Sequence, residues 1–106
     1  MRTCEIRNEA GQLTGFHISN LIITRSGVQR VVRRIPGISI TKGTRPWRWR
    51  ADDDFLYFTL NGQTFFALEE YGDTDRYCIF AKDVAGIPEI DQVRGAFEKH
   101  RVLGVI

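Results

Sequence analysis

The chain has 106 residues, of which 42% are hydrophobic and 26% are charged, as in one ordinary globular domain. Aromatic residues make up 11% of the sequence, and this fraction excludes an intrinsically disordered chain. No apolar run approaches the roughly 18 residues of a membrane-spanning helix, and charges stand where a signal peptide needs an apolar core. We therefore expect a single-domain cytoplasmic protein that makes no membrane contact.

The net charge of +2 is unevenly distributed along the chain. Residues 1–50 hold ten basic residues against Glu5 and Glu9, a net charge of +8, whereas residues 51–106 carry a net charge of −6. The two halves either neutralise each other within one fold or leave a basic surface for an anionic partner. The sequence leaves both interpretations open.

The first elements expected along the chain are a hairpin and a helix. Strands at residues 4–7 and 12–18 flank the turn Asn8–Gly11, whose residue types tolerate a tight bend. Thr24 or Ser26 caps a helix that ends at Pro36-Gly37. Its buried face is predicted by apolar residues at i, i+3, i+4 and i+7, namely Val28, Val31, Val32 and Ile35. The opposite face carries a basic ridge of Arg30, Arg33 and Arg34.

A bulged strand over residues 38–50 comes next, followed by a turn at Asp52–Asp54. Asn61-Gly62 then gives the strongest local signal, because this dipeptide favours a two-residue type I′ hairpin turn. The turn fixes the register of the hairpin, with four cross-strand pairs: Leu60 opposite Gln63, Phe58 opposite Phe65, Tyr57 opposite Phe66 and Leu56 opposite Ala67. One face then carries Leu56, Phe58, Leu60, Phe65 and Ala67, and the other carries Phe55, Tyr57, Phe66 and Leu68. Both faces are apolar, so we expect both to be covered.

A last strand at residues 77–82 leads to a second helix, which Pro88 begins. Its inward positions are Ile90, Val93, Ala96 and Phe97. The expected order is two strands, a helix, four strands and a helix. We predict the α+β class, with an antiparallel meander sheet and both helices packed on one face.

No motif for a metal, a cofactor or a catalytic group is recognisable, so none of the three is predicted. Cys4 and Cys78 lack zinc spacing. We expect both to be small buried residues on strands, and a disulfide requires their strands to be neighbours. His17 is read as a structural residue. His100 is placed in a last helical turn, where a cation suits the helix dipole.

Two segments carry candidate binding residues. The string from Arg45 to Arg50 alternates arginine with tryptophan, and the loop after residue 70 mixes aromatic, acidic and basic groups, as loops at binding sites often do. The candidate ligand-binding residues are Trp47, Trp49, Tyr71, Asp73 and Arg76. As an alternative, single-stranded nucleic acid would contact Arg30, Arg33, Arg34, Arg48 and Arg50. The simpler interpretation is that nearby acids neutralise Arg48 and Arg50, namely Asp52–Asp54, Glu69, Glu70 and the Asp73–Asp75 loop.

The run Arg33–Gly37, the Asn61-Gly62 hairpin and the string Tyr71-Gly72-Asp73…Arg76-Tyr77 resemble small uncharacterised bacterial proteins. Some of these proteins are carried as mobile gene cassettes in integrons. The resemblance implies a compact α+β domain and carries no activity.

The function expected first is a non-enzymatic binding domain. Its second apolar sheet face would be buried in a homodimer, or it would bind a small ligand or a protein partner. A nucleic-acid-associated protein is the first alternative. A small enzyme with its site near residues 71–77 is the second.

Overall fold

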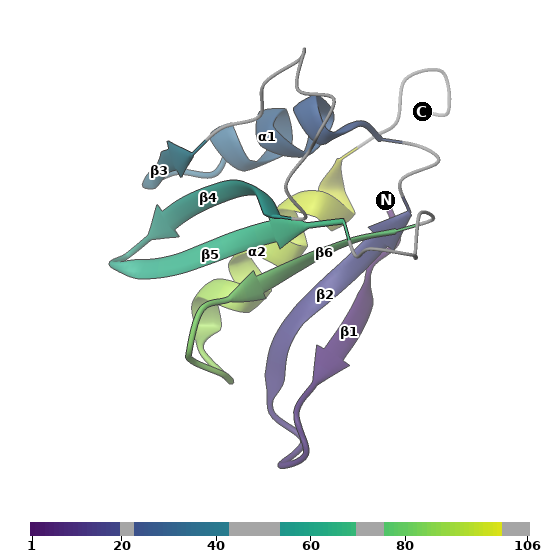
Figure 1. Ribbon diagram of the computed structural model, residues 1–106, viewed down its shortest axis with the longest axis vertical. Helices are drawn as coiled ribbons and strands as arrows, with labels where there is room; N and C mark the ends of the chain where they lie inside the picture. Colours follow the sequence, from purple (N-terminus) through teal and green to yellow (C-terminus); the bar gives the residue numbers. More distant parts are fainter. Residues whose placement is uncertain (20–22, 43–53, 70–75, 101–106) are drawn as a thin grey trace.

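The computed structural model describes residues 1–19, 23–42, 54–69 and 76–100. These residues form six strands and two helices in the predicted order (Figure 1). The elements are β1 (Cys4–Arg7), β2 (Leu13–Ser19), α1 (Arg25–Arg33), β3 (Ile38–Lys42), β4 (Asp54–Leu60), β5 (Gln63–Leu68), β6 (Arg76–Ala81) and α2 (Pro88–Lys99). The predicted α+β class is therefore confirmed. Neither helix in this described part has the length and apolar character to cross a membrane.

The sheet is antiparallel throughout, but it is not the simple meander that we predicted. Its strand order is β1-β2-β6-β5-β4-β3. Only β3 to β6 follow one another as a meander, and the β1–β2 hairpin joins the sheet beside β6. Because β2 and β3 run in the same direction with three strands between them, the connection between them must cross the sheet, and α1 lies in that crossover.

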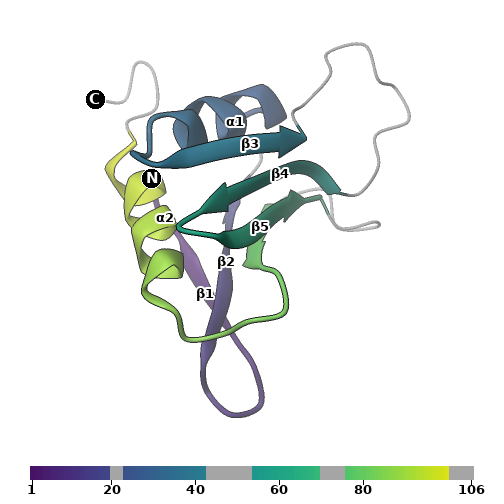
Figure 2. The ribbon, with the colours of Figure 1, turned by 90° about the vertical axis from the view of Figure 1, so that its left-hand side faces the viewer.

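The two helices and one face of the sheet enclose the core. In Figure 1, α2 lies behind the sheet, and in Figure 2 it lies to the left of the strands, with α1 beside β3. The register places one set of strand side chains on this covered face, including Phe16, Ile18, Phe58, Phe65 and Ile79. The helices contribute Val28, Val31, Val32, Ile90, Val93 and Phe97, and all of these residues are buried.

The β4–β5 hairpin has the predicted register at all four pairs. Asn61 and Gly62 have φ angles of 52° and 78°, the positive values that a type I′ turn requires. The predicted position of Phe55 is wrong, however. The register shifts between Asp54 and Leu56, and this β-bulge turns Phe55 to the covered face, where it is 5% exposed and 5.2 Å from the ring of Tyr77. Asp54 belongs to β4 rather than to the expected turn.

Helix α1 begins as the sequence predicts, because the Thr24 hydroxyl accepts a hydrogen bond from the Gly27 amide at 3.0 Å. Arg30, Arg33 and Arg34 are exposed on the face opposite the buried valines.

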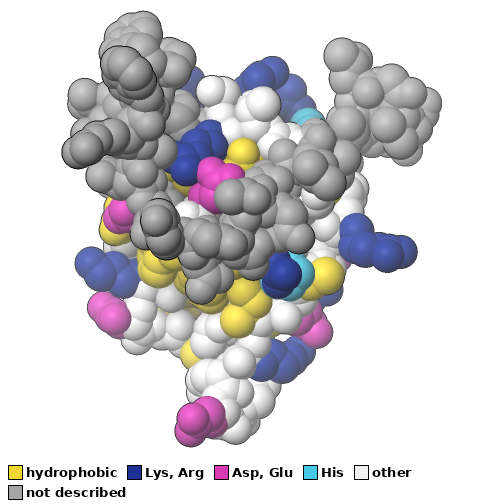
Figure 3. Space-filling model, turned by 45° about the vertical axis from the view of Figure 1, so that its right-hand side comes forward, with side chains coloured by type: hydrophobic (Ala, Val, Ile, Leu, Met, Phe, Trp, Pro, Cys, Tyr) yellow, Lys and Arg dark blue, Asp and Glu magenta, His cyan; other side chains and the backbone are white. Residues whose placement is uncertain are grey.

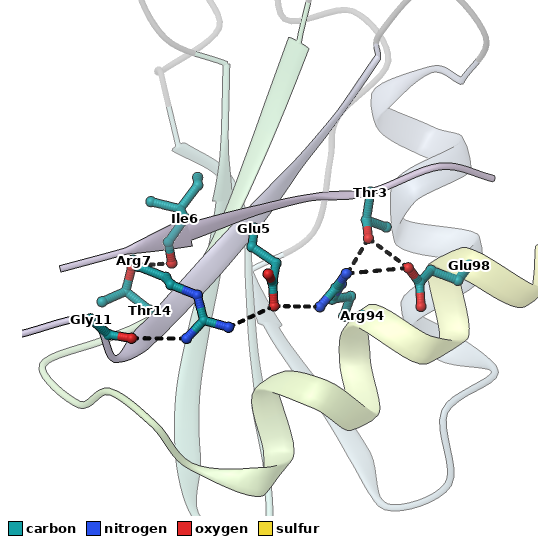
Figure 4. A network of polar contacts seen from close by, with 8 residues as sticks. All are labelled: Thr3, Glu5, Ile6, Arg7, Gly11, Thr14, Arg94 and Glu98. Atoms are coloured by element: carbon teal, nitrogen blue, oxygen red, sulfur yellow. Dashed lines mark hydrogen bonds and ion pairs between the residues drawn. The ribbon is translucent and has the colours of Figure 1, made fainter.

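A polar network fastens strand β1 to helix α2 (Figure 4). Arg94 donates to the Thr3 hydroxyl at 2.8 Å and to the Glu5 carboxylate at 2.8 Å. Thr3 donates in turn to Glu98 at 2.9 Å, and Arg7 donates to Glu5 at 2.9 Å. The network lies at the partly exposed border of the core, so we assign it a structural role, holding an edge strand against the helix.

Candidate functional site

Neither of the two described helices packs on the second face of the sheet, and in this sense we call it the uncovered face. Three aromatic side chains stand next to one another on it: Tyr57 of β4, Phe66 of β5 and Phe80 of β6, here called the aromatic ladder. The ring centroids lie 6.0 Å apart for Tyr57 and Phe66 and 5.6 Å apart for Phe66 and Phe80. All three residues are half-buried. Figure 3 shows hydrophobic side chains gathered over the sheet on this side of the molecule.

Glycine permits the ladder to lie flat against its neighbouring strand. Gly15 of β2 is the cross-strand partner of Phe80, and a Cβ atom at Gly15 would overlap the Ile79 carbonyl oxygen and the Phe80 ring. Because Gly15 has no side chain, the Phe80 ring can lie against the backbone of β2.

Charged side chains of both signs border the ladder. Lys42 of β3 lies with its Nζ atom 5.5 Å from the centroid of the Tyr57 ring, and it donates to the Asp54 carbonyl at 3.3 Å. The hydroxyl of Tyr57 donates to the Asp54 carboxylate. At the β6 end, Lys82 and Asp83 line a shallow cavity of about 470 Å³ together with the three ladder residues.

The hydrogen-bonded pair of Tyr57 and Asp54 is unsuited to proton transfer near neutral pH. The hydrogen bond from Tyr57 lowers the pKa of Asp54 below its usual 3.8, and the same bond raises the pKa of Tyr57 above its usual 10.0. A general acid or base works best with a pKa near the operating pH. Both shifts move away from neutrality, so this pair stabilises structure or orients a ligand.

A histidine and two cysteines lie next to one another on adjacent strands of the same face. His17 of β2 is the cross-strand partner of Cys4 on β1 and of Cys78 on β6. The strands of the two cysteines are therefore not neighbours, and the two cysteines form no disulfide. Cys78 is buried as expected, but Cys4 is exposed, which corrects the prediction. The reason is that β1 is an edge strand. Within the described ranges, no group of three His, Cys, Asp or Glu side chains is arranged to hold a metal.

The candidate residues predicted from the sequence are placed only in part. Trp47, Arg48, Trp49, Arg50, Tyr71 and Asp73 lie outside the described residues. Arg76 begins β6 and is half-buried. Arg30 and Arg33 lie on α1 and Arg34 is its C-cap, and this helix packs on the other side of the sheet from the aromatic ladder.

Glu69 pairs with Arg25, and the expected neutralisation of Arg48 and Arg50 stays a prediction because both arginines lie outside the described residues. The Oε1 atom of Glu69 accepts hydrogen bonds from Arg25 at 3.1 Å and 2.7 Å. The guanidinium of Arg25 also lies 4.8 Å from the centroid of the Phe55 ring. This cluster anchors the start of α1 to the end of β5.

The sequence reasoning assigned Tyr57 and Phe66 to one face, but it did not recognise the aromatic ladder as a site. The contribution of Phe80 depends on the pairing of β5 with β6. The alternation of residues along the strand Tyr77–Lys82 places Phe80 on the other face of the sheet from Tyr77 and Ile79. This alternation is the signal in the sequence that could have assigned Phe80 to the aromatic ladder.

Comparisons of the chain with protein-family models, with curated proteins and with solved structures found no match. The expected likeness to small bacterial proteins carried on gene cassettes therefore stays a prediction.

Proposed function

We propose that this protein is a non-enzymatic binding domain that self-associates through its uncovered sheet face. The observation that carries the proposal is the aromatic ladder, because three adjacent aromatic rings stand half-buried on a face that neither helix packs against. Contiguous apolar patches of more than a few hundred Å² are rare on monomers, and they mark interaction surfaces. Aromatic side chains are also enriched at the centres of protein interfaces.

The charges around the ladder favour a second copy of the chain over nucleic acid. Among the described residues beside the ladder, Lys42 and Lys82 are matched by Asp54 and Asp83. A nucleic-acid site gains its affinity from an excess of basic groups. A symmetric dimer, in contrast, needs a surface complementary to itself, and a patch bordered by both signs satisfies this requirement.

Sedimentation equilibrium over a micromolar concentration series tests the proposal. We expect the wild-type chain to form a dimer and the Phe66→Glu variant to be monomeric, because two buried carboxylates would face each other in a symmetric contact. The matched control is Arg33→Glu, an exposed change on α1 that should leave the dimer intact. Thermal melts of both variants establish that the fold is retained.

Binding of single-stranded DNA is the competing outcome. A monomeric wild-type chain that binds single-stranded DNA at about 150 mM salt, with binding lost in Phe66→Glu, would identify the ladder as a base-stacking surface. This result would overturn self-association as the function of the face.

A further inference from the structure

Helices α1 and α2 leave a groove between them, on the side of the molecule away from the aromatic ladder. Its cavity volume is about 500 Å³, within the roughly 300–1,000 Å³ typical of small-molecule sites. The floor is apolar and is formed by Val31, Ile35 and Ala96. The groove therefore offers an apolar bed large enough for a small organic molecule.

The rim of this groove is positively charged. Arg34 and Lys99 are exposed cations at the rim, and Asp91 is the acidic residue among the lining side chains. The amino group of Met1 lies 2.9 Å from the His100 carbonyl oxygen. Each helix C-terminus contributes a partial negative charge of only about one half. The full positive charges of the side chains therefore dominate the electrostatic potential at the rim of the groove.

His100 reports this positive potential. Its pKa is lowered by burial first, and then by the positive charges of Arg34, the amino terminus and Arg30. The positive charges that lower this pKa therefore come from α1, from its C-cap and from the start of the chain. His100 is the C-cap of α2 rather than part of its last turn, and its lowered pKa disfavours the cation that we expected to serve the helix dipole.

Gly95 lies inside α2 at the groove, and packing does not explain it. Among the described residues, no atom would lie within 4 Å of a Cβ atom at this position. Glycine weakens a helix interior relative to alanine, so a side chain here would stabilise the helix while narrowing the groove. The missing side chain leaves the backbone of α2 open to close approach by a ligand.

We propose that the groove between α1 and α2 binds a small organic anion, in which one carboxylate is joined to an apolar body. Arg34 and Lys99 hold the carboxylate, and the apolar body lies over Ala96 beside Gly95. The proposal is independent of self-association, because none of these residues lies on the uncovered face.

An NMR titration with a matched pair of probes, 4-phenylbutyrate and 4-phenylbutan-1-ol, tests this assignment. We expect 4-phenylbutyrate to bind with a Kd of about 1 mM or tighter and to shift the His100 ring resonances. It should also raise the pKa of His100, because a bound negative charge stabilises the imidazolium. The neutral alcohol should bind at least about tenfold more weakly, since it lacks the charge. Equal binding of the acid and the alcohol would overturn the proposal.

Variants locate the binding. Gly95→Leu should abolish it by filling the groove, whereas Gly95→Ala should retain it. Arg34→Gln should weaken it about tenfold, and Arg33→Gln, exposed on the same helix outside the groove, should leave it unchanged. Undiminished binding in Arg34→Gln would contradict the assignment even if Gly95→Leu failed to fold. Repeating the titration with Phe66→Glu tests whether the probe binds at the aromatic ladder instead. We expect the His100 shift to persist in this variant, and its loss would contradict a site in the groove.

Discussion

The β4–β5 hairpin carries two aromatic pairs in neighbouring positions, and they face opposite sides of the sheet. Phe58 and Phe65 stack with centroids 5.2 Å apart and planes within 3°, and they are at most 1% exposed beneath the helices. Tyr57 and Phe66 stand one residue away, 6.0 Å apart and half-buried. Similar side chains are therefore fully buried beneath the helices on one face and only half-buried on the other. The two pairs differ in burial because the helices cover one face of the sheet and not the other.

The largest expected effect separates these two pairs. Phe58→Ala should lower the free energy of unfolding by about 3–5 kcal/mol, because it opens a cavity in a closely packed core. Phe66→Ala should cost the monomer about 1 kcal/mol or less, because its ring is already in contact with water. Denaturant melts of both variants, made at a concentration below dimer formation, measure the contrast. Equal losses would mean that the uncovered face is core as well.

Gly15 tests whether the uncovered face is closely packed anywhere. Gly15→Ala should destabilise the fold by about 1–3 kcal/mol, as overpacking does, because the new methyl group meets the Ile79 carbonyl oxygen and the Phe80 ring. Urea unfolding provides the measurement. A neutral result would show that β2 and β6 can separate at this point, and that the ladder is less rigid at Phe80 than at Tyr57.

The smallest expected effect concerns the Tyr57–Asp54 hydrogen bond. Tyr57→Phe removes this bond but keeps the ring, so we expect a loss of about 1 kcal/mol or less at pH 7 and unchanged self-association. The pKa of Asp54 is lowered in the folded state, so its contribution is present above the usual value of 3.8 and is lost as the pH falls through the folded pKa. The difference between wild type and Tyr57→Phe should therefore shrink in acid. A constant difference down to the lowest pH would show that this bond does not depend on the ionised carboxylate.

Local signals in the sequence predicted most of the fold. Asn61-Gly62 specified the hairpin turn and, with it, the four predicted pairs up to the bulge next to Leu56. The spacing of Val28, Val31 and Val32 specified the buried face of α1. These features depend on residues close together in the chain, so periodicity and turn chemistry are sufficient to predict them.

Features that depend on distant residues were missed. The placement of β2 beside β6 brings Gly15 under Phe80 and His17 between the cysteines. The alternation of residues along a single strand does not predict which strands pair, so this strand order could not be predicted. The bulge that moves Phe55 to the covered face is a second case, because the alternation itself assigns Phe55 to the other side. The groove between α1 and α2 likewise depends on how the two helices pack.

Intermolecular contacts seen by isotope-filtered NMR test the central claim most directly. In a mixture of labelled and unlabelled chains, we predict nuclear Overhauser effects between protomers that involve the rings of Tyr57, Phe66 and Phe80. The absence of such effects at concentrations where the chain sediments as a dimer, or their appearance only from α1 and α2, would contradict an interface on the uncovered face. A chain that remains monomeric at these concentrations would contradict self-association itself.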